Sequence, residues 1–195
     1  GTIPAAVSSI RPYLPSMPVS KMIRDFGLQL SGGMVSAINI SASVSDKYWS
    51  AEKWSLLLDA FPDRRFIVFS APKERDLLLK KKLEDHHDNV TASPVTGNLS
   101  EVAELMRTIG FLVSLDTSLI HVASCLNVPV VGLYRNRRDD IVRFSPLSER
   151  HEIVVSSGEL VDDIPAGQVI EAVSRLCDVI RMPAQISSVA LHDAG

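Results

Sequence analysis

Residues 111–134 read FLVSLDTSLIHVASCLNVPVVGLY, and this stretch decides the fold class. Its two ends, 111–115 and 128–134, are short apolar runs that do not alternate with polar residues. Strands of that kind are buried on both faces, which is typical of a parallel sheet covered by helices. Between them, 119–126 is apolar and small enough for a short buried helix. The stretch therefore predicts a strand, a helix and a second strand parallel to the first.

The same alternation continues on both sides of this stretch. We expect further strands at 35–41, 65–70 and 152–156, and further helices at 21–30, 50–61, 73–85, 98–109 and 165–180. In the helix at 73–85, Leu77, Leu78 and Leu79 are expected on the buried side and the run Lys80-Lys81-Lys82 on the solvent face. Asn98 and Glu101 have the spacing of a helix-capping box. The order of elements predicts an α/β fold, a three-layer α/β/α domain with a parallel sheet.

Composition limits the function classes. The chain has 195 residues, enough for one domain with extensions, and its net charge of −3 implies no general affinity for nucleic acid. No apolar run reaches the roughly 18 residues of a membrane span, and no signal-peptide pattern is visible. The cysteines, Cys125 and Cys177, form no CxxC pair, which argues against a disulfide framework or a zinc site and suits a reducing compartment.

Polar residues gather where three of the predicted strands end. Ligands of open parallel sheets bind outside the carboxyl ends of the strands, and here those ends lead into loops 41–49, 70–74 and 116–121. In the last loop, the free N–H groups of a helix start and the hydroxyls of Thr117 and Ser118 form an anion site. The equally weighted alternative is that Asp116 or Thr117 only caps the helix. The GxGxxG and GxxxxGKT phosphate loops are absent.

These loops resemble glycosyltransferase family 9, the bacterial heptosyltransferases of lipopolysaccharide synthesis. The stretch at 111–134 matches the family's signature at Asp116, Thr117, His121, Ala123, Pro129 and Tyr134. The segment at 40–61 matches at Lys47 and Trp49, and FSAPKERDLLL at 69–79 places Glu74 at the family's acidic position. The resemblance covers about residues 36 to 157.

The resemblance implies the GT-B architecture, two Rossmann-like domains with the active site between them. The chain would be the C-terminal, donor-binding half. Residues 1–34, which hold four prolines, would be an interdomain linker or arm, 35–182 the Rossmann-like nucleotide-sugar-binding domain, and 183–195 a C-terminal tail.

By position in the family's motifs, eight residues would bind the donor. Lys47 would pair with the diphosphate of a nucleotide-sugar such as ADP-heptose, and Ser43 would donate a hydroxyl beside it. Glu74 would accept from the ribose hydroxyls, and Asp116 would hold sugar hydroxyls. Backbone N–H groups would be presented to phosphate by Thr117, Ser118 and Leu119, and His121 would lie just beneath them. A lysine and a helix start can stabilise a departing diphosphate without a metal, so no cofactor is expected.

The resemblance further implies inverting transfer to a glycolipid or surface-glycan acceptor, in the cytoplasm or, within it, at the inner face of the bacterial inner membrane. The general base would lie on the other domain, so we expect no catalytic residue within this chain and no transfer by the chain alone. The alternative is a non-catalytic relative that binds a nucleotide or a partner protein.

Two positions depart from the family's motifs, and a third residue has two possible locations. Ser118 stands in place of the loop glycine, which matters if the backbone there needs positive φ. Arg135 replaces the glycine after Tyr134, and the basic run 135–138 is expected to be a solvated loop, with contact to an anionic acceptor as the second interpretation. Trp49 would lie either beside a nucleotide base or against the sheet.

Overall fold

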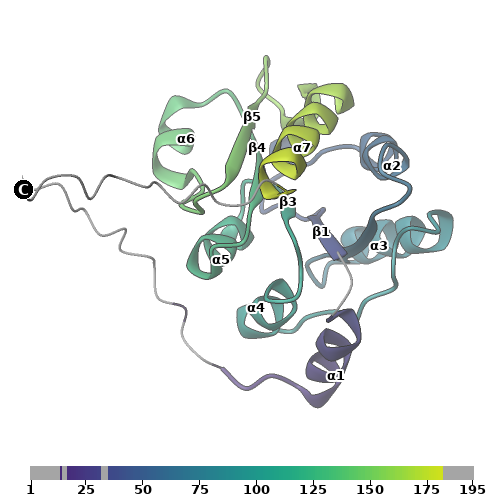
Figure 1. The fold of residues 1–195 in the computed structure, drawn as a ribbon. Coiled ribbons are helices and arrows are strands. Elements are labelled where there is room, and N and C mark those ends of the chain that lie inside the picture. Colours follow the sequence, from purple (N-terminus) through teal and green to yellow (C-terminus); the bar gives the residue numbers. More distant parts are fainter. Residues whose placement is uncertain (1–13, 15–16, 32–34, 182–195) are drawn as a thin grey trace, which may run out of the picture.

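The computed structural model describes residues 14, 17–31 and 35–181 (Figure 1). Its centre is a five-stranded, fully parallel sheet in the order β2-β1-β3-β4-β5. The strands are β1 (Val35–Asn39), β2 (Arg65–Phe69), β3 (Leu112–Leu115), β4 (Val130–Tyr134) and β5 (His151–Val155). Every residue of β1, β3 and β4 is buried, as their continuous apolar sequences predicted. The predicted α/β/α fold with a parallel sheet is confirmed.

Helices cover both faces of the sheet. They are α1 (Lys21–Leu30), α2 (Ala51–Asp59), α3 (Glu74–His86), α4 (Leu99–Met106), α5 (Ser118–Leu126), α6 (Arg138–Phe144) and α7 (Ala166–Arg181), with short 3₁₀ turns η1 (Ser45–Lys47) and η2 (Val161–Asp163). Figure 1 shows α2 and α7 on one side of the sheet and α4 and α5 on the other, and each side has its own hydrophobic cluster. The helix α1 joins the α4 and α5 side through Ile23 and Leu30. This is a three-layer, Rossmann-like arrangement.

The strand order reverses direction between β1 and β3. The chain moves from β1 outward to β2, then crosses back to β3 on the other side of β1. The connections therefore leave β1 and β3 toward opposite sides at their carboxyl ends, which opens a crevice there. The loops after β1, β2 and β3 meet at this edge of the sheet.

The buried side of α3 differs from the expectation. Asp76, Lys80 and Leu83 are its buried residues, whereas Leu78 is 63% exposed. Successive helical residues turn by about 100°, so three adjacent leucines cannot share one face, while positions 76, 80 and 83 can. The placement of Lys80 on the solvent face was therefore wrong.

The buried Lys80 completes the free edge of β2. Beyond β1, the only strand pairing of β2 among the described residues is a single bridge from Phe66 to Val90. The next outward carbonyl, that of Val68, accepts from Lys80 Nζ at 2.7 Å, and the same ammonium contacts Ser93 Oγ at 2.5 Å. A salt bridge of 2.8 Å to Glu84 balances its charge.

The predicted start of α4 is present. Asn98 caps α4, because its side-chain oxygen accepts from the N–H groups of Ser100 and Glu101 at 2.9 and 3.1 Å. The Glu101 carboxylate accepts from Gly97 N at 2.7 Å and from Ser20 N at 3.1 Å, so it also fastens the start of α1. These hydrogen bonds, that of Gly97 first, lower the pKa of Glu101.

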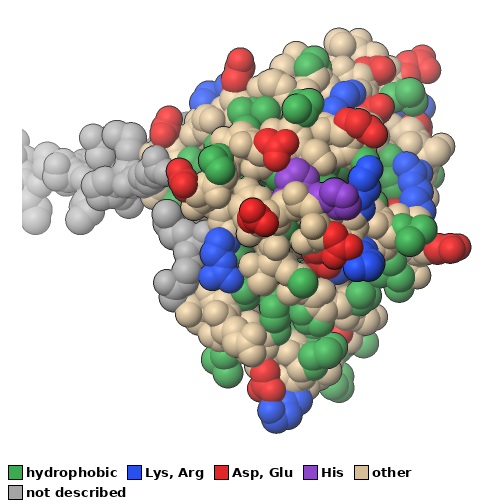
Figure 2. Space-filling view, turned by 90° about the vertical axis from the view of Figure 1, so that its right-hand side faces the viewer, with side chains coloured by type: hydrophobic (Ala, Val, Ile, Leu, Met, Phe, Trp, Pro, Cys, Tyr) green, Lys and Arg blue, Asp and Glu red, His purple; other side chains and the backbone are tan. Residues whose placement is uncertain are grey.

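The surface and the domain bounds complete the description. On the face drawn in Figure 2, acidic and basic side chains are interspersed rather than gathered by sign. No helix in the described part of the chain has the length and apolarity to cross a bilayer. Residues 1–13, 15, 16 and 32–34 of the expected arm and the tail from 183 lie outside the described residues, so the division at 1–34, 35–182 and 183–195 stays a prediction.

Candidate functional site

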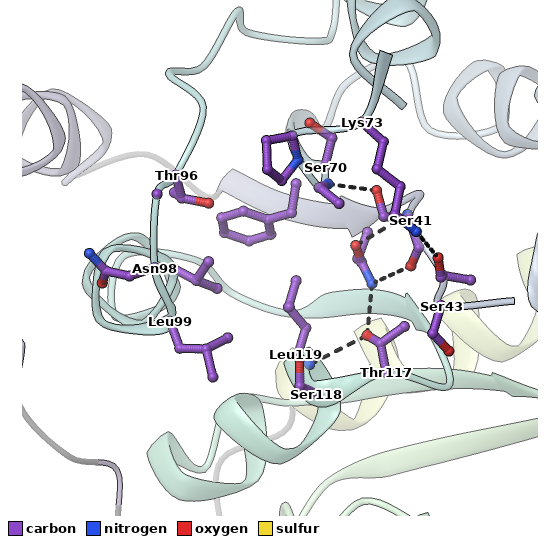
Figure 3. A pocket seen from close by; sticks show the side chains of 17 residues that line it. Ser41, Ser43, Ser70, Lys73, Thr96, Asn98, Leu99, Thr117, Ser118 and Leu119 are labelled. Atoms are coloured by element: carbon purple, nitrogen blue, oxygen red, sulfur yellow. Dashed lines mark hydrogen bonds between the residues drawn. The ribbon is translucent and has the colours of Figure 1, made fainter. Parts of the chain in front are cut away.

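A cavity of about 530 Å³ opens at the reversal point of the sheet (Figure 3). Two strand ends and two helix starts contribute to it. The lining residues are Asn39 and Ser41–Ser43 after β1, Phe69–Lys73 after β2, Thr96–Leu99 and Val102 at the start of α4, and Thr117–Leu119 at the start of α5. Four of the eight predicted site residues, namely Ser43, Thr117, Ser118 and Leu119, therefore lie on its wall.

A buried asparagine holds the start of α5 against β1. Asn39 Nδ2 lies 3.0 Å from both Ser114 Oγ and Thr117 Oγ1, and Thr117 Oγ1 also accepts from Leu119 N at 3.4 Å. Thr117 is thus the N-cap of α5, a role that is compatible with an anion bound at the same helix start. Asn39 is not among the residues predicted for the site, although an amide at the end of an otherwise apolar strand is a recognisable signal in the sequence.

Serine and lysine side chains fasten the loops after β1 and β2 to each other. Ser41 Oγ accepts from Ala71 N at 2.7 Å, and Lys73 Nζ donates to the carbonyl of Ala42 at 3.1 Å (Figure 3). Lys73 leaves an exposed cation on the cavity wall. Because the positive ends of α4 and α5 also face this space, the wall suits an anion or a ligand rich in hydrogen-bond acceptors.

Two predicted site residues pair with each other beside the cavity. Lys47, at the end of η1, makes a 2.6 Å salt bridge with Asp116, which directly follows β3. Their side chains are 15% and 7% exposed, so the pair is largely withdrawn from water. Neither residue lines the cavity in the described chain, but Asp116 is next to Thr117, which does. The structure therefore brings together a cation, a carboxylate and a helix start from segments far apart in sequence.

A second ion pair adjoins the first. Arg135, which follows β4, is buried and pairs with Asp46 of η1. The expected solvated loop is wrong for Arg135, because the parallel strand β4 delivers it to the same edge of the sheet as Asp116. Arg137 and Arg138 are exposed, as expected, but Arg138 begins the short helix α6, which the sequence analysis missed.

The remaining predicted residues lie apart from the cavity wall. Glu74 is exposed at the first position of α3, directly after the lining residue Lys73. His121 is partly buried in α5, with its ring centroid 6.1 Å from that of Phe144. Trp49 is in the core, where its Nε1 donates to the carbonyl of Ile164 at 2.9 Å. Of its two expected positions, beside a nucleotide base or packed against the sheet, the structure shows the second.

The serine at the glycine position is accommodated without strain. Among the described residues, Asn127 is the one non-glycine residue with positive φ, and Ser118 is the first helical residue of α5. A side chain at position 118 therefore meets no conformational penalty.

Two other reactive groups, the Tyr134 hydroxyl on β4 and the Cys125 thiol near the end of α5, are unreactive at neutral pH. Burial, and next to it the charge of Asp116, raises the pKa of the Tyr134 hydroxyl, which donates to the carbonyl of Phe144 at 2.6 Å. Burial also raises the pKa of Cys125, which keeps it a thiol rather than a nucleophilic thiolate. Within the described ranges, no three His, Cys, Asp or Glu side chains are grouped so as to hold a metal ion.

Comparison with known proteins gives one family and a set of related folds. The model of glycosyltransferase family 9 (heptosyltransferase) matches residues 17–164. The solved structures include E. coli heptosyltransferase WaaC with ADP, with a TM-score of 0.66 and 20% identity over 78% of this chain and 48% of that one. E. coli ADP-heptose lps heptosyltransferase II has a TM-score of 0.65 and 21% identity over 85% and 54%. A family 9 glycosyl transferase from Veillonella parvula has a TM-score of 0.65 and 18% identity over 82% and 52%. No curated protein sequence matches the chain. The chain spans about half the length of these solved structures.

Proposed function

The chain belongs to glycosyltransferase family 9, and from this premise we propose that it is the nucleotide-sugar-binding domain of an inverting, heptosyltransferase-like enzyme. The observation that carries the proposal is the meeting of the Lys47–Asp116 pair with the start of α5 at the edge of a 530 Å³ cavity. A diphosphate needs a cation and N–H donors, and a sugar needs a hydrogen-bond acceptor; this edge supplies all three.

Each group has a distinct task in the proposed complex. The Lys47 ammonium and the N–H groups at the start of α5 bind the diphosphate and stabilise the charge that develops on it as the glycosidic bond breaks. Asp116, freed in part from Lys47, accepts from sugar hydroxyls. Glu74 accepts from the ribose, and Ser43 donates to the diphosphate. His121 supports the first turn of α5 from below.

The donor we propose is an adenosine diphosphate sugar such as ADP-heptose. The E. coli WaaC structures hold ADP or ADP-2-deoxy-2-fluoro heptose, and that chemistry is transferred to this chain as part of the proposal. The general base and the acceptor site lie on a second domain of the GT-B type. The acceptor is a lipopolysaccharide or related glycolipid at the cytoplasmic face of the membrane, and no metal takes part. The chain alone binds the donor and transfers nothing.

Titration calorimetry with ADP tests this proposal. Wild-type chain binds ADP, and Lys47→Ala weakens binding by about 1.5–3 kcal/mol, the contribution of a charged hydrogen bond. Lys21→Ala is the control, because Lys21 is exposed on α1 and pairs only with a neighbour one turn away. Absence of ADP binding by the wild type contradicts the proposal, and unchanged affinity in Lys47→Ala removes Lys47 from the site.

The second candidate is a nucleotide-binding relative that has lost transfer. It is favoured by the departure from the family's motif at Arg135, which stands in place of the glycine after Tyr134. A transfer assay on the longest natural form of the protein separates the two: sugar transfer supports the enzyme, and ADP binding without transfer supports the relative.

A further inference from the structure

Five successive residues around η1 are each fastened to a distant part of the chain. Two of them form ion pairs: Asp46 with Arg135, and Lys47 with Asp116 at 2.6 Å. Three donate hydrogen bonds: Tyr48 Oη to Asp76 Oδ2 at 3.2 Å, Trp49 Nε1 to the carbonyl of Ile164 at 2.9 Å, and Ser50 N to Asp162 Oδ1 at 2.8 Å. We call 46–50 the anchored segment. Its own backbone holds it weakly, because η1 has only the turn bonds from Lys47 N to Val44 O and from Tyr48 N to Ser45 O, at 3.2 and 3.3 Å. Tertiary contacts therefore set the position of Lys47.

Two of these contacts form a compact group of four charges. Lys47 and Asp46 are neighbours in sequence, and their partners Asp116 and Arg135 follow the neighbouring parallel strands β3 and β4. The side chains of Arg135 and Asp46 are 8% and 29% exposed. The two cations and two anions balance, so the group adds no net charge to the edge where the proposed diphosphate would bind.

We infer that Arg135 is a positioning residue for Lys47, acting through Asp46. The guanidinium is buried at the end of a central strand, which makes it a rigid reference point, and its pair with Asp46 holds the backbone of η1. The Lys47 ammonium sits on a flexible four-carbon stem, so the place of its backbone decides where the charge is presented. This inference rests on the proposed function, because positioning has an effect only if Lys47 binds an anion.

Positioning and simple electrostatics predict opposite results when Asp46 is neutralised. Asp46→Asn removes a negative charge beside the anion site and ends the ion pair between Asp46 and Arg135. Electrostatics alone then strengthens anion binding. If Arg135 positions Lys47, anion binding becomes weaker, because η1 loses its ionic attachment to the residue that follows β4.

A double replacement isolates positioning from charge. In Asp46→Asn/Arg135→Leu the net charge of the group is the same as in the wild type, so electrostatics predicts wild-type affinity. Positioning predicts weaker binding, since the attachment is gone. Arg135→Lys keeps the charge and most of the reach, and is the conservative rescue.

The measurement is titration calorimetry of the full chain with ADP, alongside thermal unfolding of each variant. We expect Asp46→Asn and the double variant to bind ADP about tenfold more weakly, the scale of one charged hydrogen bond, with the stoichiometry unchanged. Arg135→Lys stays within about threefold of the wild type. Arg175→Leu, which breaks an exposed pair with Glu152 between α7 and β5, is the matched control and leaves binding unchanged.

The outcomes separate the inference from the proposed function. Asp46→Asn or the double variant binding ADP as tightly as the wild type, or more tightly, overturns the inference and leaves the proposed function standing. A loss of stoichiometry at constant affinity also overturns it, because that result reports unfolded protein rather than a displaced lysine. No ADP binding by the wild type overturns the proposed function itself.

Discussion

Replacing the buried Lys80 with methionine is the sharpest test of how this fold protects the edge beside its site. The substitution keeps an apolar stem of similar length and removes the ammonium. Three partners lose a donor: the carbonyl of Val68 at 2.7 Å, Ser93 Oγ at 2.5 Å and Glu84 Oε1 at 2.8 Å. Since Ser93 comes shortly before the cavity-lining residues 96–99, the loss also loosens one wall of the site.

The expected cost follows from what is left buried. The side chains of Lys80 and Glu84 are 6% and 13% exposed, and Glu84 keeps Ser93 N at 3.0 Å as a donor. Removing one partner of a buried pair costs about 3–5 kcal/mol. Two effects reduce this cost for Lys80→Met. Water reaches Glu84 in part. Burial also lowers the pKa of Lys80, which means that the ammonium carries a desolvation cost that methionine does not have. We therefore expect a loss of about 2–3 kcal/mol in the free energy of unfolding.

Lys81, on the same helix α3, is the control for Lys80. Lys81 makes the same kind of pair one residue later, with Asp85 at 2.8 Å, but its side chain is 74% exposed. Lys81→Met is expected to cost less than about 0.5 kcal/mol. Urea unfolding followed by the fluorescence of Trp49 and Trp54 measures both variants, with an unchanged m-value as the sign of a pure stability effect. Equal stability of the two variants would refute the reasoning, and Lys80→Met/Glu84→Gln should recover part of the loss.

Two further predictions concern the start of α4. Asn98→Ala removes the acceptor of two N–H groups and should lower the free energy of unfolding by about 1 kcal/mol, measured in urea, while Asn136→Ala at an exposed position changes little. Because the pKa of Glu101 is lowered from its ordinary 4.5, its contribution is fully present above that value and is lost as the pH falls through the lowered one. Glu101→Gln should therefore be less stable at pH 6 but lose less stability between pH 6 and pH 3 than the wild type. A parallel loss in both proteins would show that Glu101 does not contribute to acid sensitivity.

The architecture and the side of the sheet that carries the candidate site could be predicted from the amino-acid sequence. Continuous apolar runs such as 111–115 and 128–134 favour burial on both faces, and a parallel sheet between helices provides that. The loops after the first three strands were predictable as the ligand side, because carboxyl ends of parallel strands share one edge. Caps such as Asn98 are local chemistry and could be predicted from neighbouring residues alone.

Only the tertiary structure decided which charges meet. Asp116 and Lys47 are 69 residues apart, and Arg135 and Asp46 are 89 apart, so no local pattern connects them. The same holds for Lys80, whose place in a run of three lysines is typical of a solvent face, while the helix rotation against β2 turns it inward. Hydrophobic periodicity predicts which side of a helix or strand is buried. The partner of a buried charge depends instead on how elements that are distant in sequence pack against each other.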